Sequence, residues 1–143
     1  MEPALPELLT QLFDVADTAR AEATATLAEF ELSGSQAGML WALNPALPPV
    51  PMRELARRLL CDPSNVTLMS AKLEKAGLVE RRPHPSDGRV RVLALTERGV
   101  EVWHKLMDRI TATSPVLRLS SAERRRLAEL LTKIQNSADS LRP

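Results

Sequence analysis

The segment from residue 51 to residue 95 constrains the fold most, because the ends of its elements are marked by particular residue types. Asp62 is a favourable N-cap, and Pro63 stands at the first helical position, where a missing backbone N–H costs nothing. Gly77 is typical of the left-handed residue that ends a helix. The sequence therefore predicts a short helix that begins at Pro63 and stops at Gly77.

A second short helix is predicted immediately before it. In MRELARRLL, helical spacing separates an apolar face from an arginine face. The apolar face carries Met52, Leu55, Ala56 and Leu59, and the other face carries Arg53, Arg57 and Arg58. Because only the tight junction LLCD separates the two helices, they are predicted to form a helix-turn-helix. Its second helix is the candidate reader of DNA, and its exposed face carries Ser64, Asn65, Thr67 and Lys72.

A β-hairpin is predicted after Gly77. LVERR and RVRVLAL alternate apolar with basic residues, as half-buried strands do, and the turn formers PHPSDG separate them. Beside a helix-turn-helix such a hairpin is a wing. The chain has 19 Lys and Arg against 18 Asp and Glu, so its net charge of +1 is low for a DNA-binding protein. Between Arg81 and Arg91, however, four arginines accompany a single acid, Asp87, so positive charge is concentrated in this hairpin.

Longer helices are predicted at both ends of the chain. An apolar stripe recurs every three or four residues from Leu5 through Leu27 to Phe30, and a second one runs from Leu127 to Leu141. Both stripes exceed what a small winged domain can cover. Between the N-terminal helix and the helix-turn-helix, the capping box of Ser33 and Gln36 opens a short helix.

The remaining boundaries also follow from local signals. Four prolines deny residues 44–51 the backbone donors of a helix or central strand, which predicts a connecting loop. Thr96 is expected to cap a helix that stops near Thr113, and Ser120 with Glu123 forms a second capping box before the last helix.

Composition narrows the class of protein. A chain of 143 residues has room for one ordinary globular domain, and an aromatic content of 3% requires an aliphatic core. No apolar run reaches the roughly eighteen residues that span a bilayer, and no signal peptide is visible, so a cytoplasmic location is expected. The single Cys61 cannot form an intramolecular disulfide and is expected to pack at the junction before the reader helix.

Catalytic and metal-binding chemistry have no visible basis in this sequence. His84 and His104 are isolated, and no Cys, His or Asp cluster has metal-ligand spacing. Neither a nucleophile with its base nor a carboxylate pair is recognisable. We therefore expect no enzyme activity, no cofactor and no metal.

Several ordered motifs together resemble one family. LSGSQAGMLWAL, MRELARRLLCDPSNVT, KLEKAGLVERRPHPSDGRVRVLALTERG and LSSAERRRLAELL are similar, in order and spacing, to the MarR family of bacterial transcriptional regulators. The similarity extends from about Leu32 to Ile134. It implies a mainly α fold with a small β-hairpin wing, in which a winged helix-turn-helix core is flanked by N- and C-terminal dimerisation helices. Residues 1–32 would be the N-terminal dimerisation helix, 33–96 the DNA-binding domain and 97–143 the C-terminal dimerisation helices, all in one intertwined unit.

The resemblance also implies function and partners. Members of the family are homodimers that bind palindromic operators in double-stranded DNA, and many release the DNA when a small anionic or phenolic effector or an oxidant acts on them. The resemblance therefore implies a homodimeric repressor with a palindromic operator and such an effector as partners. Redox sensing through Cys61 is not favoured, because sensor cysteines of the family usually lie in the N-terminal helix.

The reader helix carries short polar side chains that can approach base edges. Asn65 can pair with adenine through two hydrogen bonds, and Ser64 and Thr67 can bond bases or phosphates. Lys72 is expected to anchor the helix on the DNA backbone. Leu68 departs from the Arg or Gly common in the family, which would shift base preference toward thymine methyl groups. Ser70 also departs, from the family's usual aliphatic residue.

The wing supplies the second set of candidate DNA contacts. By resemblance, Arg89 is the family's minor-groove arginine, and Asp87 holds the turn and orients it. A narrow A·T-rich minor groove attracts such an arginine. Arg91, with Arg81 and Arg82, is interpreted as part of a solvated strand face that makes incidental phosphate contacts. The alternative function is a winged-helix protein-interaction module without DNA binding, which would more often show apolar anchors on the reader helix.

Overall fold

The computed structural model describes residues 3–140, and of Leu27 and Asp139 it describes only the backbone. Leu141 and the side chain of Leu27, both assigned to apolar stripes, therefore lie outside the described residues. The elements follow in the order α1 (Leu5–Ala28), α2 (Gly34–Ala42), β1 (Val50–Pro51), α3 (Met52–Leu59), α4 (Pro63–Lys75), β2 (Val79–Pro83), β3 (Arg91–Leu95), α5 (Glu97–Thr113), the 3₁₀ helix η1 (Pro115–Arg118) and α6 (Ser121–Ser140). The mainly α fold with a small β wing is confirmed.

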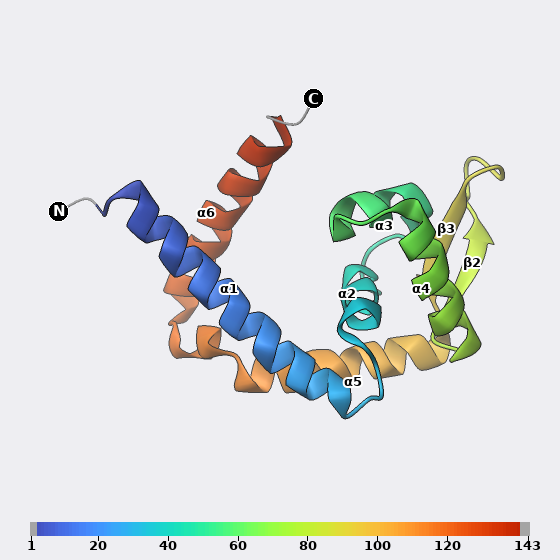
Figure 1. Ribbon diagram of the computed structural model, residues 1–143, viewed down its shortest axis with the longest axis horizontal. Coiled ribbons are helices and arrows are strands. Elements are labelled where there is room, and N and C mark those ends of the chain that lie inside the picture. The colour runs from blue at the N-terminus through green and yellow to red at the C-terminus, as the bar shows by residue number, and fades with distance from the viewer. Residues whose placement is uncertain (1–2, 141–143) are drawn as a thin grey trace.

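The molecule has a winged helix-turn-helix at one end and two long helical arms at the other. Figure 1 shows α2, α3, α4 and the β2–β3 hairpin gathered on one side, while α1 and α6 extend away from them on the other. The helix α5 joins the two parts, because it follows β3 and packs against α1. The arm α1 is thus attached to the winged domain mainly through its packing against α5.

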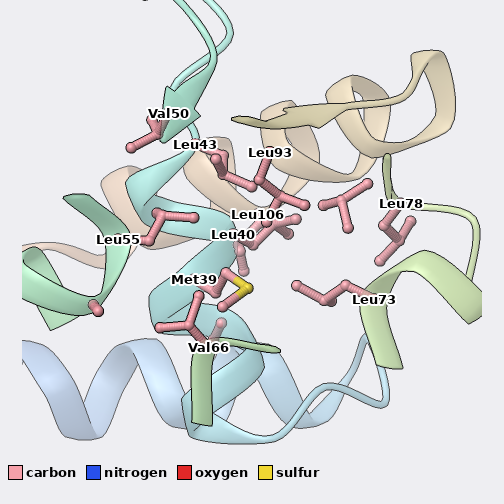
Figure 2. Packing of buried hydrophobic residues seen from close by; sticks show 13 residues of the cluster. Met39, Leu40, Leu43, Val50, Leu55, Val66, Leu73, Leu78, Leu93 and Leu106 are labelled. Atoms are coloured by element: carbon pink, nitrogen blue, oxygen red, sulfur yellow. The ribbon is translucent and has the colours of Figure 1, made fainter. Parts of the chain in front are cut away.

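One aliphatic core holds the winged helix-turn-helix together, and α2 lies at its centre (Figure 2). Side chains from α2, α3, α4, β3 and α5 meet there and are almost completely buried: Met39, Leu40, Leu55, Val66, Leu73, Leu93 and Leu106. Burying one such side chain contributes roughly 1.5–3 kcal/mol. Because α5 supplies Leu106, the core includes the first helix after the wing as well as the helix-turn-helix itself.

The turn between α3 and α4 is tight because Leu60 adopts the left-handed conformation, with φ of 51°. The Cys61 backbone N–H donates to the Ala56 carbonyl at 3.1 Å, which closes the turn. Asp62 occupies the N-cap position and Pro63 the first position of α4, as predicted, although the Asp62 side chain makes no capping hydrogen bond. Cys61 is partly buried and packs against the core, as expected.

The end of α4 connects the reader helix to the wing. Gly77 has a φ of 75° and is left-handed, as predicted. Its N–H donates to the Glu74 carbonyl at 2.9 Å, and the Leu78 N–H donates to the Leu73 carbonyl at 3.0 Å. This is a Schellman ending, in which the buried Leu78 supplies the hydrophobic contact.

The sheet contains a strand that the sequence did not predict. Residues 44–51 were expected to be a loop, but Val50 and Pro51 form β1, which pairs antiparallel with β3 opposite Leu93 and Val92. The strand order is β1-β3-β2, so β1 lies at an edge. The prediction was wrong because proline is excluded from central strands only, and an edge strand tolerates it.

The predicted helix caps are confirmed. Ser33 and Gln36 form a complete capping box before α2, and Thr96 accepts a hydrogen bond from the Gly99 N–H before α5. At the start of α6 the Glu123 carboxylate accepts the Ser120 N–H at 2.8 Å, and the Ser120 hydroxyl accepts the Glu123 N–H at 3.3 Å. The 3₁₀ helix η1 between α5 and α6 was not anticipated.

Candidate nucleic-acid interface

The exposed face of α4 presents the predicted reader residues. Ser64, Asn65, Leu68 and Lys72 are all exposed, and Val66 and Leu73 on the opposite face are buried in the core. Asn65, Leu68 and Lys72 line one side of a groove of about 490 Å³, whose other side is the beginning of α2. Leu68 places an apolar side chain on this otherwise polar face, and it is 57% exposed.

Thr67 takes part in the structure of its own helix. Its hydroxyl donates to the Pro63 carbonyl at 3.0 Å, one turn earlier. The hydroxyl oxygen can still accept a hydrogen bond. Thr67 can therefore offer an acceptor and a methyl group to a partner without losing this bond.

The contacts of Arg81 differ from those expected from the sequence. It was assigned to a solvated strand face, but its guanidinium reaches from β2 back to α4. Its Nη2 donates to the Ser70 hydroxyl at 3.0 Å and to the Thr67 carbonyl at 3.3 Å, and its Nε lies 3.3 Å from a carboxylate oxygen of Glu74. Ser70 is completely buried, and its hydroxyl donates to the Thr67 carbonyl at 3.0 Å. Arg81 thus joins the wing to the reader helix.

The polar serine at position 70 explains why Arg81 can do this. An aliphatic residue there would offer no acceptor to the guanidinium. The charged partner Glu74 lies one turn further along α4 and shares the same arginine. Alternation of apolar and basic residues in a strand gave no signal for this contact, because Ser70 and Thr67 belong to another element and lie eleven and fourteen residues away in the sequence.

The wing loop between β2 and β3 is closed by its own hydrogen bonds. The His84 N–H donates to the Val90 carbonyl at 2.8 Å, and the Val90 N–H donates to the Asp87 carbonyl at 3.0 Å. Asp87 also accepts the Arg89 backbone N–H at 3.1 Å. Asp87 therefore organises the tip of the wing from both its main chain and its side chain.

Arg89 projects from this tip into solvent. Its side chain is 95% exposed, and its Nε lies 3.5 Å from the Asp87 carboxylate, a long and exposed ion pair. Such a pair contributes little stability in water. The guanidinium is therefore available to another partner at small cost.

The other arginines of the winged helix-turn-helix differ in their partners. Arg57 and Arg58 contact Glu54 at 2.7 and 2.9 Å, and Arg82 is paired with Glu80. For Arg53 and Arg91, both exposed, no ion pair is found within the described residues. From the sequence, Arg53 was assigned only to the arginine face of its helix.

Two arginines of α3 determine the ionisation of Glu54. Hydrogen bonds from Arg57 and then Arg58 lower the pKa of the Glu54 carboxyl from 4.5 to about 2. The carboxylate is therefore ionised throughout the physiological range. It holds two of the three positive charges of α3 in a local cluster on the helix surface.

A separate cavity lies between α1 and the winged domain. It has a volume of about 470 Å³, and its walls come from α1, α2 and α5. Small and apolar side chains dominate its lining, together with Trp41 and Arg20: Ala19, Ala23, Ala37, Leu106 and Ile110. An apolar cavity with one cation at its wall suits an aromatic ligand that carries a negative charge.

Residues 3–140 contain neither a cluster of metal ligands nor a membrane-spanning helix. Within that range, no three His, Cys, Asp or Glu side chains come together as metal ligands would. No helix in the same range is long and apolar enough to span a bilayer.

The winged helix-turn-helix of this chain is similar to a known protein family. Residues 40–90, which include the helix-turn-helix and most of the wing, match the model of the MarR family. The resemblance predicted from the sequence is thereby confirmed. No curated protein sequence gives a significant match.

Solved structures confirm the fold over nearly the whole chain. CouR from Rhodococcus jostii RHA1, bound to p-coumaroyl-CoA, is similar with a TM-score of 0.77 and 23% identity, covering 93% of this chain and 95% of that one. AbsC, a MarR family transcriptional regulator from Streptomyces coelicolor, gives 0.73 at 20% identity, covering 98% and 99%. Wild-type apo MarR from E. coli gives 0.68 at 23% identity, covering 94% and 98%.

Proposed function

From the MarR-family match of its winged helix-turn-helix and a fold shared with MarR-family regulators, we propose that this chain is a sequence-specific DNA-binding transcriptional regulator. It acts as a homodimeric repressor on a palindromic operator, and a small ligand releases it. The site is made of Ser64, Asn65, Thr67, Leu68 and Lys72 on α4, with Asp87, Arg89 and Arg91 on the wing.

The observation that carries this proposal is the tie between α4 and the wing. Arg81 connects β2 to the middle of α4, so the strand that leads into the wing loop is held against the polar reader helix. A reader helix in the major groove and an arginine in the neighbouring minor groove require such a fixed relation. Asn65 reads adenine, Leu68 contacts thymine methyl groups, and Lys72 holds a phosphate.

The operator is the most informative unknown, and it can be recovered directly. Purified full-length protein is incubated with fragmented genomic DNA, and the retained fragments are sequenced. We expect a short inverted repeat whose half-sites are one helical turn apart, roughly 34 Å. Retention of no DNA, or of DNA without a shared motif, would contradict sequence-specific binding.

Arg89 provides a test that concerns the wing alone. Arg89→Ala is expected to weaken operator binding most when the flanks are A·T-rich, because the minor groove is narrowest and most negative there. Arg89→Lys should recover only part of the loss, since an ammonium is more strongly hydrated than a guanidinium. Because the side chain is exposed, melting temperature should not change. Equal affinity of wild type and the alanine variant would show that Arg89 does not contact DNA.

The cavity between α1, α2 and α5 is the proposed effector site. It is apolar, it contains Trp41 and Arg20 at its wall, and CouR, which shares the fold, is bound to p-coumaroyl-CoA. An anionic phenolic compound would place its ring near Trp41 and its charge near Arg20. A ligand that binds there changes the indole fluorescence, and Trp41→Phe should remove that change while Trp103 remains as an internal reference.

A protein-interaction module remains the second candidate, because one apolar side chain is exposed on the reader face and another in the turn before it. Leu60 is 76% exposed and Leu68 is 57% exposed. Apolar anchors on a helix are typical of binding to protein grooves. The DNA-retention experiment distinguishes the two functions, since this module retains no operator.

A further inference from the structure

We propose that Arg53 and Arg91 bind one backbone phosphate of the DNA in a recess between the start of α3 and the loop end of the wing. This site rests on the proposed DNA-binding function and adds to it a contact from α3, outside the reader helix and the wing. The recess has a volume of about 310 Å³ and is lined by Pro51, Met52, Arg53, Arg89, Val90 and Arg91.

The edge strand β1 explains why Arg53 lies beside the wing. Pro51 pairs with Val92, so β1 ends opposite the beginning of β3, where Arg91 is the first residue. The helix α3 begins at Met52, directly after this pairing. The first turn of α3, which carries Arg53, is thereby held against the strand that leads to Arg89. Without the pairing of β1 with β3, nothing in this loop would fix the distance between Arg53 and Arg91.

The charges around the recess are unbalanced. Three of its six lining residues are arginines, and none is acidic. The arginines elsewhere in the winged helix-turn-helix are held close to carboxylates: Arg57 and Arg58 by Glu54, Arg81 by Glu74 and Arg82 by Glu80. Among the described residues Arg53 and Arg91 have no such partner, and Arg89 has only the exposed contact of 3.5 Å with Asp87. Among the described residues, the arginines of this domain without a close carboxylate are therefore concentrated at one place.

The ligand that fits this place is a phosphate diester on DNA. Guanidinium groups bind phosphate oxygens through paired, charge-assisted hydrogen bonds. In a helix-turn-helix the first helix crosses the DNA backbone while the second enters the major groove. A recess between the first helix and the wing consequently faces the strand that separates the major groove from the minor groove. Arg53 and Arg91 hold that strand, and Arg89 continues into the minor groove.

The test measures operator affinity of the full-length protein at several salt concentrations. Arg53→Ala is expected to weaken binding roughly ten-fold, about the size of one charge-assisted hydrogen bond. It should weaken specific and scrambled DNA alike and reduce the salt slope by about one, because one phosphate contact is lost. Arg58→Ala is the matched control, since it removes the same charge from the same helix but its guanidinium is held by Glu54 outside the recess. It should retain the wild-type slope.

Neutral methylphosphonates, placed singly along the operator, then identify the phosphate. The wild type should lose affinity at the position that the recess holds. Arg53→Ala and Arg91→Ala should both be less sensitive than the wild type at that same position, because one of the two arginines is missing, while keeping the wild-type response elsewhere. Both side chains are exposed, so melting temperature and oligomeric state should match the wild type.

The possible failures are distinguishable. Wild-type affinity and slope in Arg53→Ala, or a phosphate response unchanged by the substitution, would overturn the recess while leaving the DNA-binding function intact. Sensitivity of Arg53→Ala and Arg91→Ala at two different positions would also overturn the shared phosphate. A wild type that binds no DNA would overturn the proposed function, and the recess with it.

Discussion

At the scale of single residues, the exposed face of α4 combines side chains with different physical roles. Asn65 offers an amide that matches the edge of adenine, whereas Lys72 offers only a point charge. Both are exposed and line the same groove. Replacing each residue by alanine should therefore reduce DNA affinity, and the two reductions should differ in their dependence on DNA sequence and on salt.

Asn65→Ala is expected to cost about 1–3 kcal/mol on the operator and almost nothing on scrambled DNA, because a base-edge contact carries sequence information. Lys72→Ala should weaken both DNAs equally and reduce the salt slope by about one. Binding titrations of the two variants on both DNAs measure this difference. If Asn65→Ala lost equal affinity on scrambled DNA, its assigned role as a base reader would be wrong.

The lowered pKa of Glu54 predicts how the stability of the fold depends on pH. Its folded-state pKa of about 2 lies below the ordinary 4.5, so its ion pairs stabilise the fold above about pH 4.5 and cease to do so as pH falls toward 2. Glu54→Gln should lower the free energy of unfolding at neutral pH by up to about 1 kcal/mol, the usual range for exposed pairs. The difference from wild type should shrink in acid and in high salt. Chemical denaturation across pH tests this, and a difference that grows in acid would contradict it.

At the scale of elements, the contacts of the wing with α4 and α5 decide the geometry of the site. Arg81 ties β2 to α4, and the start of α5 packs on the chain between α4 and β2. The Leu78 carbonyl accepts the Thr96 N–H at 3.0 Å, and the Thr96 hydroxyl donates to the Gly77 carbonyl at 2.6 Å. Both contacts join segments that are remote in sequence.

Arg81→Ala is expected to loosen the wing. Amide hydrogen exchange of β2 and β3 should become faster in the free protein, and operator affinity should fall because Arg89 is no longer held in place. Arg82→Ala is the control, since its guanidinium pairs with Glu80 on the same strand. In the Arg89→Ala background, Arg81→Ala should add little further loss. An additive loss there would mean that Arg81 contacts DNA itself.

Gly99 lies where α5 packs tightly against the chain between α4 and β2. A Cβ atom at this position would lie 1.9 Å from the Leu78 carbonyl oxygen, which is backbone and cannot move away easily. Gly99→Ala should therefore destabilise the fold by about 1–3 kcal/mol, although alanine is the better helix former. Gly34→Ala, at the start of α2 with open space around it, should have little effect. Thermal unfolding distinguishes the two, and equal melting temperatures would contradict this packing.

At the scale of the whole molecule, the arms expose apolar surface that a monomer has no means to cover. On α1 the exposed fractions include 67% for Leu5 and 63% for Phe13, and on α6 they include 54% for Ile134. Patches of this kind mark interfaces between proteins. Two copies related by a two-fold axis would bury α1 and α6 against each other and present two copies of α4 to a palindrome.

Sedimentation should therefore find a dimer at micromolar concentration. Phe13→Asp combined with Ile134→Asp should produce monomers, because two charges would be buried in the interface. Leu47→Asp is the control, since Leu47 is 57% exposed but belongs to the loop before β1 rather than to the arms. The double variant should also bind operator more weakly, because each monomer holds only one half-site. A wild type that sediments as a monomer would contradict this arrangement.

Local signals in the sequence were sufficient for most element boundaries. Asp62 and Pro63 begin α4, Gly77 ends it, and the Ser33 and Ser120 boxes open α2 and α6. The Gly77 ending and the two capping boxes depend on hydrogen bonds within about five residues, and Pro63 begins α4 because its fixed backbone angle suits the first helical position. The candidate reader residues followed in the same way, because helical periodicity separates the exposed face of α4 from the buried one.

Only the tertiary structure decided which distant residues meet. The edge strand β1, the tie between Arg81 and Ser70, and the recess shared by Arg53 and Arg91 each join segments more than ten residues apart. A sequence pattern records which side chains are polar or apolar, but not which of several arginines finds a carboxylate. That choice depends on the register of β3 against β1 and on the packing of α4 against β2. Long-range packing therefore neutralises Arg81 and leaves Arg53 and Arg91 unpaired among the described residues.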